Sequence, residues 1–247
     1  MSVTRGGFLA GLAHIWRSFA LLRAPGVRVY VLVPLLINVG VFVLALGSLG
    51  EAVDYTIARY LGNLPEFVRW LAWVLFAILA AIVVFFSFSV VANLVASPFN
   101  GLLAQAVERH LRGQAEALPF DLATLFGELA RTLWAELRKL LYMALWGVPL
   151  VLFSLIPVLN AVAPALWLLF GAWMLCMEYL DCPLGNHGRV FPQVLRTMRA
   201  RRPLALGFGL GMTAVTLVPV LNFVAVPLGV AAATRLYCID LAPDDGR

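Results

Sequence analysis

Long uncharged blocks alternate with shorter polar stretches along this chain, and their lengths suit membrane helices. Residues 29–49 contain no charged side chain, and neither do residues 70–96. At about 1.5 Å per residue, each block is long enough to cross a hydrocarbon core of roughly 30 Å as a helix. The polar residues 51–69 between them predict a loop or a short helix. The pattern therefore predicts two transmembrane helices.

Two further segments carry apolar residues at helical spacing among polar ones. Residues 7–23, ahead of the first block, predict an amphipathic helix that lies in the membrane interface or packs on the other helices. Residues 101–139, after the second block, predict polar, amphipathic helices in two pieces divided near Pro119. Pro98 marks the expected end of the second block.

The last hundred residues contain a repeated pattern. Two apolar segments, residues 140–177 and 204–239, each carry a central Pro-Val-Leu-Asn word, and the two words stand 62 residues apart. Each arm has about 15–17 residues, roughly 22–26 Å as a helix, which is marginal for a full crossing. Because proline and asparagine favour a turn, we expect two helical hairpins that enter the membrane and turn back. Four further crossings are the alternative, since membrane helices tolerate prolines.

Composition agrees with a membrane protein. Of the 247 residues, 62% are hydrophobic and 13% are charged, whereas soluble domains carry about 25% charged residues. So few charges do not cover a water-facing surface, which excludes a soluble enzyme. The predicted fold is a single all-α integral membrane domain over residues 1–247. It has two long transmembrane helices, two partially penetrating hairpins and an N-terminal amphipathic helix.

The basic residues are distributed unevenly. If two blocks cross and both hairpins enter from one side, 16 of the 18 lysines and arginines lie on that side. The positive-inside rule makes it the cytoplasmic side. A basic excess is usual where a protein meets the anionic cytoplasmic leaflet, so the net charge of +5 indicates a lipid bilayer and no nucleic-acid partner.

No recognisable catalytic or metal-binding motif is present. The chain lacks HExxH, GxxxxGK[ST], GxSxG and CxxC patterns. Glu178 and Asp181 stand three apart, but they end an apolar arm, where anchoring at the interface is the commoner role. Cys182 and His187 supply only two of the four ligands that a structural zinc needs. We predict no enzyme activity, no catalytic residues, no metal and no cofactor.

The strongest candidate site precedes the first block, in the words Pro25-Gly26-Val27-Arg28. A helix start offers N–H groups and the positive end of the helix dipole, and an arginine beside it suits a tetrahedral oxyanion. Arg23 is close enough in sequence to add a second cation. An arginine anchored at lipid headgroups is the alternative. The candidate anion-binding residues are Arg23, Gly26, Val27 and Arg28.

Uncharged polar residues lie in and just after the two blocks: Asn38, Asn93, Ser97 and Asn100. Such side chains either line a polar path or hydrogen-bond helices to one another. No acidic residue lies deep in an apolar block, which argues against a proton-coupled carrier.

Four stretches, in order, resemble the CysZ family of bacterial sulfate-uptake proteins. They are PGVRVYVLVPLLIN (25–38), NLVASPFNGLLAQAVE (93–108), YLDCPLGNH (179–187) and GFGLGMTAVTLVPVLNFVAVPLGVAAAT (207–234). The resemblance implies a multi-pass protein of the bacterial inner membrane that admits sulfate for cysteine biosynthesis. It also implies two long transmembrane helices, partially penetrating hairpins and a homo-oligomer.

The resemblance also implies particular residues. The family's Gly-x-Arg element, associated with sulfate binding, matches Gly26, Val27 and Arg28, and its Ser-Pro-Phe-Asn stretch matches residues 97–100. Two positions depart from the family pattern. An acidic residue expected after that Asn is Gly101, which weakens a pore-lining role there. A basic residue that often follows the Gly-x-Arg is Val29, so Arg28 needs Arg23 or a neighbouring subunit to neutralise a dianion.

We therefore expect channel-like or facilitative uptake of sulfate. A proton-coupled sulfate symporter is one alternative, and uptake that collapses with an uncoupler would identify it. A membrane scaffold without transport is the other, since composition alone fits it equally well.

Overall fold

The computed structural model describes residues 6–60, 65–113, 122–222 and 224–242, with side chains outside 83–98, 122–135 and positions 38, 42, 53, 54, 57 and 80. Every regular element in these ranges is helical, which confirms the all-α class. The elements are α1 (Phe8–Ser18), η1 (Leu21–Arg23), α2 (Arg28–Tyr60), α3 (Glu66–Arg112), α4 (Leu122–Ser154), η2 (Leu159–Ala161), α5 (Ala163–Asn186), α6 (Phe191–Ala200), α7 (Arg202–Leu217), α8 (Pro219–Asn222), α9 (Ala225–Leu236) and η3 (Tyr237–Leu241).

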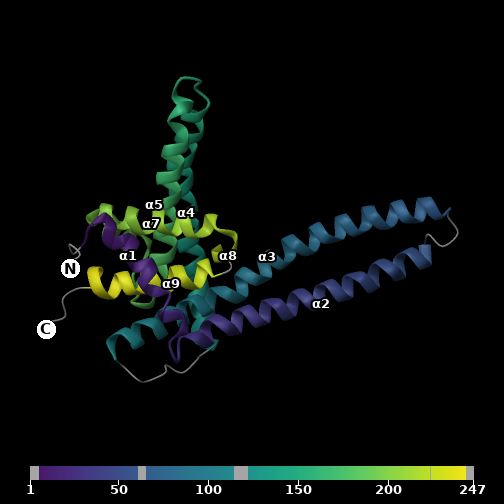
Figure 1. Cartoon of the computed structure of the whole chain (residues 1–247), viewed down its shortest axis with the longest axis horizontal. Coiled ribbons are helices and arrows are strands. Elements are labelled where there is room, and N and C mark those ends of the chain that lie inside the picture. Colours follow the sequence, from purple (N-terminus) through teal and green to yellow (C-terminus); the bar gives the residue numbers. More distant parts are fainter. Residues whose placement is uncertain (1–5, 61–64, 114–121, 223, 243–247) are drawn as a thin grey trace. The chain divides into compact units, whose positions relative to one another are not determined.

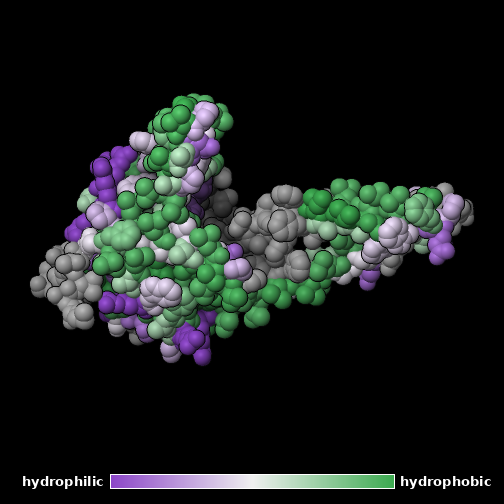
Figure 2. All heavy atoms as spheres, turned by 45° about the horizontal axis from the view of Figure 1, so that its top comes forward, coloured by the Kyte–Doolittle hydropathy of each residue, from purple (hydrophilic) through white to green (hydrophobic). Residues whose placement is uncertain are grey.

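The chain divides into two units. Residues 31–99 form one unit, and residues 1–30 together with 100–247 form the other. In the first, α2 and α3 run in opposite directions (Figure 1). Their described surface is hydrophobic over most of its length, with hydrophilic residues toward the end where they join (Figure 2). The predicted polar interruption at 51–69 is shorter in the structure, because α2 reaches Tyr60 and α3 begins at Glu66.

Prolines do not end the long helices. The helix α3 continues through position 98 to Arg112, so the expected end at Pro98 is wrong. Pro34, Pro149 and Pro183 likewise lie inside α2, α4 and α5. Each proline removes one backbone hydrogen bond, and a long apolar helix tolerates that loss where neighbouring groups satisfy the freed carbonyl.

The packed core of the larger unit is formed by α1, α5, α7 and α9, which Figure 1 shows grouped together. Glycines bring their backbones into direct contact. A Cβ atom added at Gly207 would strike the carbonyl of Phe8, and one at Gly209 would strike the carbonyl of Ala172. Gly11 faces the carbonyl of Leu204 in the same way. Small residues allow this approach, and dispersion contacts then hold the helices together.

The helix α1 buries an unusual face. His14, Ile15 and Ser18 are buried against the unit, whereas Leu9 and Trp16 are 71% and 65% exposed. The exposed face therefore carries large apolar side chains beside Arg17, as expected for a helix whose outer side meets the membrane interface.

The two Pro-Val-Leu-Asn hairpins differ, contrary to the prediction of similar arms. Among the described residues, three helices are long and apolar enough to cross a membrane, judged by length and composition: Arg28–Ala52, Glu136–Ser154 and Ala163–Asn186. The last two belong to α4 and α5, which extend past the predicted arms because neither Arg138, Lys139 nor Pro183 interrupts them. By contrast, α7 and α9 have 16 and 12 residues, about 24 and 18 Å at 1.5 Å per residue.

The hairpin of α4 and α5 projects beyond the rest of its unit (Figure 1). Its outer part carries exposed apolar side chains, among them Leu155 at 72% and Val158 at 84%. An apolar surface of this kind needs lipid or another apolar partner.

The glycine contacts give a test of the core. Gly209→Ala puts a methyl group against the backbone of α5, and overpacking of this kind costs about 1–3 kcal/mol of stability. Gly171→Ala is the matched control, because nothing lies within 4 Å of its added Cβ and alanine favours a helix over glycine by about 1 kcal/mol. Thermal unfolding in detergent should rank G171A at or above wild type and G209A below it. Equal unfolding temperatures for all three proteins would contradict this packing.

Candidate anion-binding site

A tight turn joins η1 to α2 and carries the candidate anion-binding residues. Ala24 is extended, at φ −63° and ψ 141°, and Gly26 follows at φ +83°. A side chain is strained at this φ whatever the space, and nothing lies within 4 Å of an added Cβ. The glycine is therefore required by the backbone conformation. Val27, 1% exposed, anchors the turn in the unit.

Two backbone N–H groups of the turn form hydrogen bonds within the turn itself. The N–H groups of Val27 and Arg28 both donate to the carbonyl of Ala24, at 3.1 and 3.2 Å. Within the described residues, the N–H of Gly26 donates to no backbone carbonyl. An anion at this turn thus finds Gly26 N–H open, whereas the Val27 amide is already engaged.

Two cations flank this turn and are open to an anion. Arg23 and Arg28 are both exposed, and neither forms an ion pair with any residue that the structure describes. A guanidinium offers paired donors in a planar fork that suits an oxyanion. Arg23 and Arg28 therefore stand on either side of the turn that contains Gly26, and the side chain of Val27 in the same turn is buried.

Most side chains of the predicted polar path lie outside those that the structure describes. The side chains of Asn38, Asn93 and Ser97 lie outside the described residues, and Asn100 is half-buried on α3. Next to it, the carbonyl of Gly101 accepts a hydrogen bond from Nδ2 of Asn186 at 2.9 Å. Two of the family-like stretches, 93–108 and 179–187, therefore meet in the structure.

A polar cluster that sequence reasoning missed lies beside this contact. Nε2 of His187 is 3.0 Å from both carboxylate oxygens of Glu108, and Nη2 of Arg112 is 2.8 Å from Oε1 of Glu108. The ring of Tyr237 lies 5.0 Å from the ring of His187. The spacing of Glu108 and Arg112 by four residues was visible in the sequence, but the contacts to His187 and Tyr237 join distant segments.

The same cluster includes a thiol. Cys238 hydrogen-bonds Arg112; burial and the nearby Glu108 carboxylate raise its pKa, so it is held as the neutral thiol. Burial opposes the charge on Arg112 most strongly, but Glu108, Cys238 and Tyr237 together outweigh burial and raise the pKa of the guanidinium. No group of three or more metal-ligating side chains occurs in the described part of the chain.

Other buried charges are paired as well. Lys139, whose side chain is 6% exposed, lies 2.8 Å from Glu136, 2.8 Å from Asp181 and 3.3 Å from Glu178. Glu178 and Asp181 therefore join α5 to α4 through one ammonium group. This arrangement leaves neither carboxylate set apart as a general acid or base.

A second pair joins the N-terminal helix to the end of the chain. Nε2 of His14 lies 2.7 Å from Oδ2 of Asp240, and both side chains are about 5–6% exposed. Asp240 lies in η3, a turn of π-helix. Burial lowers the pKa of His14 despite Asp240, and the charges of Arg235 and Arg17 lower it further.

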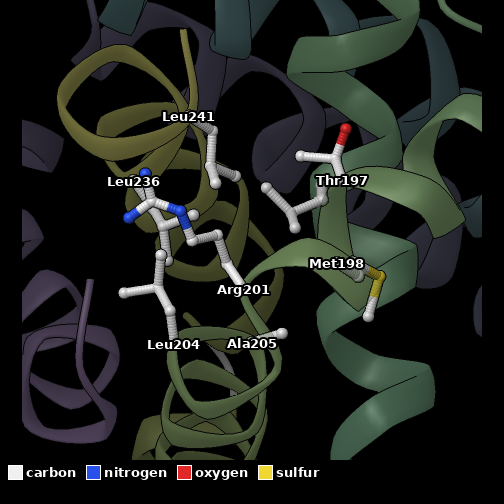
Figure 3. Close-up of a pocket in the computed structure, with 8 residues that line it drawn as sticks. Thr197, Met198, Arg201, Leu204, Ala205, Leu236 and Leu241 are labelled. Carbon is white, nitrogen blue, oxygen red and sulfur yellow. The ribbon is translucent and has the colours of Figure 1, made fainter.

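A small pocket of about 160 Å³, partly open to solvent, lies between α5, α6, α7 and the C-terminal turn (Figure 3). Leucine, methionine and alanine side chains line it, and Arg201 and Thr197 are its only polar lining residues. So few polar groups do not replace the hydration of a dianion, so this pocket is a poor sulfate site.

Comparisons with known proteins agree with the predicted family. Residues 14–227 match the family described as Sulfate transporter CysZ/Etoposide-induced protein 2.4. The chain is 37% identical to a protein named Sulfate transporter CysZ from Pseudomonas paraeruginosa, over 93% of this chain and 94% of the relative. Relatives with the same name are 38% identical in Pseudomonas fluorescens, over 93% of both chains, and 37% identical in Vibrio cholerae, over 94% of both. These relatives are transporters and not enzymes, which confirms the predicted non-enzymatic class.

The His14–Asp240 pair predicts how stability depends on pH. The pKa of His14 is about 6.5 in the unfolded chain and lower in the folded one, so the unfolded chain binds the proton more readily. The contribution of His14 to stability is complete above about pH 6.5 and falls as the pH drops toward the folded-state pKa, by at most about 1.4 kcal/mol per pH unit. Denaturant unfolding between pH 7.5 and 5.0 measures this slope. His14→Gln should flatten it, and an unchanged slope in that variant would assign the dependence to other groups.

Proposed function

Because the chain belongs to the Sulfate transporter CysZ/Etoposide-induced protein 2.4 family, we propose that it carries sulfate across the bacterial inner membrane. The imported sulfate supplies cysteine biosynthesis. The observation that carries the proposal is the turn at Gly26, where an open amide lies between two unpaired arginines in a chain of this family.

Capture of sulfate begins at this turn. Gly26 N–H donates one hydrogen bond, and Arg28 and Arg23 supply charge-assisted donors that together balance the two negative charges. Val27 keeps its side chain in the core and so holds the turn in place. The dianion is bound at the exposed side of this turn.

Beyond the turn, sulfate follows a path lined by Asn38, Asn93, Ser97 and Asn100. Amide and hydroxyl groups replace water hydrogen bonds without holding the ion tightly, which conduction requires. The Glu108 carboxylate does not repel an anion as a free charge would, because Arg112 and His187 both contact it.

Passage is channel-like or facilitative in this proposal. In the candidate spans Glu136–Ser154 and Ala163–Asn186, the carboxylates of Glu136, Glu178 and Asp181 all pair with Lys139. Intramembrane carboxylates that carry protons are usually poised for exchange, whereas these share a fixed cation. The one observation that favours a proton-coupled symporter instead is the Glu108–His187 pair, since both partners are titratable and lie beside the matched family stretches.

The protein spans the membrane several times and works as a homo-oligomer. The short arms α7 and α9 penetrate partway from the cytoplasmic side, and α2 crosses fully. A neighbouring subunit covers part of the exposed apolar surface. It also offers a further cation where this chain has Val29 after its Gly-x-Arg element.

Mutation of Arg28 gives the most direct test of the anion-binding turn. Arg28→Ala should weaken sulfate affinity by about 10- to 100-fold, the range for one charge-assisted interaction of about 1.5–3 kcal/mol. Arg28→Lys should recover part of it, because it keeps the charge but loses the planar fork. Titration of purified protein with sulfate measures the affinity, and Arg59→Ala, an exposed arginine near the far end of α2, is the control. Unchanged affinity in R28A would remove this turn from the mechanism.

Flux into liposomes tests the transport mode. Purified protein should admit sulfate saturably without an imposed proton gradient, in preference to chloride and phosphate. Uptake that rises with an inward proton gradient and collapses with an uncoupler would establish the symporter. A folded, inserted protein with no flux above empty liposomes would support the scaffold.

A further inference from the structure

An unpaired basic surface lies where α6 meets α7. The helix α6 buries Phe191, Val194, Leu195 and Met198 against the unit, and its opposite side is exposed. Arg196 and Arg199 lie on that exposed side, and Arg202 begins α7. We call these three residues the arginine corner.

No carboxylate among the described residues pairs with this corner. Residues 182–239 contain no aspartate or glutamate. None of the three arginines forms an ion pair with any described residue. Within the described part of the chain, these three exposed guanidinium groups are therefore available to an external anion.

The short distance along α7 from Arg202 to the buried apolar residues sets the depth of the arginine corner in the membrane. This argument rests on the proposed entry of the α7–α9 hairpin into the membrane. Arg202 is the first residue of α7, and the buried apolar run of that helix begins at Leu204. Two residues amount to about 3 Å along a helix. An arm that enters the hydrocarbon therefore leaves Arg202 at the depth of the lipid headgroups, where long basic side chains extend toward phosphates.

The arrangement of the corner suits several headgroups better than one free ion. Arg196 and Arg199 follow one another along the surface of α6, and Arg202 begins α7. The pocket of Figure 3 is lined by Arg201 and by none of these three arginines. The guanidinium of Arg201 also packs over the backbone of Gly6. The pocket is therefore not an enclosed oxyanion site formed by the corner arginines.

We propose that Arg196, Arg199 and Arg202 bind the phosphate groups of anionic phospholipids in the leaflet from which the α7–α9 hairpin enters. Basic side chains near a membrane surface each strengthen binding to anionic lipid by about fivefold. Headgroups bound here tie the base of the hairpin to the leaflet and fix its depth.

Lipid retention by the purified full-length protein tests the proposal. The protein is held in nonionic detergent doped with phosphatidylglycerol or phosphatidylcholine, and bound lipid is counted by native mass spectrometry. Wild type should retain phosphatidylglycerol in preference, and R196Q/R199Q/R202Q should lose at least tenfold in affinity for it. R196K/R199K/R202K should keep most of the preference, because it keeps the charge. Arg59→Gln, at the far end of α2, should change nothing.

Three outcomes would overturn the proposal. The first is wild-type retention by the triple glutamine variant while it stays folded by its elution volume. The second is an equal loss in Arg59→Gln, which would indicate overall charge. The third is displacement of phosphatidylglycerol by millimolar inorganic phosphate or sulfate but not by sodium chloride of equal ionic strength, which would indicate a free-oxyanion site. Lipid counting uses no transport assay, so failure of sulfate flux would be seen separately.

Discussion

Backbone-to-backbone contact between helices is the constraint on which the larger unit depends. Where helices face lipid, burial of apolar side chains gives little net gain, because lipid is as apolar as leucine. Close approach at Gly11, Gly207 and Gly209 replaces that driving force with dense van der Waals contact. The positions of α1 and α5 against α7 follow from these three glycines, and the turn at Gly26 is held by Val27, which is buried in the same unit.

Several ion pairs in this unit connect one helix to another. Lys139 joins α4 to α5, Glu108 joins α3 to the end of α5, and Asp240 joins η3 to α1. An unpaired charge in a low-dielectric interior is costly, so each pair favours one arrangement of its helices over others. By contrast, Arg23 and Arg28 at the Gly26 turn and the three residues of the arginine corner are exposed and form no ion pair with a described residue, so they are available to external anions.

Much of the helical organisation could be predicted from local patterns. The block 29–49 falls within the candidate span Arg28–Ala52. The first Pro-Val-Leu-Asn word lies between α4 and α5, and the second forms the short helix α8 between α7 and α9. The anion turn was visible as well, because a Pro-Gly pair ahead of an apolar helix predicts a break with glycine backbone geometry. Which amides remain open there depends on hydrogen bonds to Ala24, and these were not visible in the residue types.

The remaining features come from contacts between distant segments. Periodicity in residues 7–23 predicts an amphipathic helix but not that His14 and Ser18 face inward and Trp16 outward, since Asp240 lies 226 residues away. The cluster of Glu108, His187 and Tyr237 joins three separate helices for the same reason. The arms α4 and α5 are longer than predicted, because single charges and prolines do not end a helix that is packed against others or embedded in lipid.

The place of α1 in the fold has a consequence for how the chain is made. Its partners, α7, α9 and η3, all come from residues 202–241, so α1 leaves the ribosome long before any of them exists. During synthesis its buried face, with His14 and Ser18, has nothing to dock against, whereas Leu9 and Trp16 already have lipid available. A helix synthesised well before its partners is therefore among the last to reach its final contacts, and residues 202–241 complete the surface on which it packs.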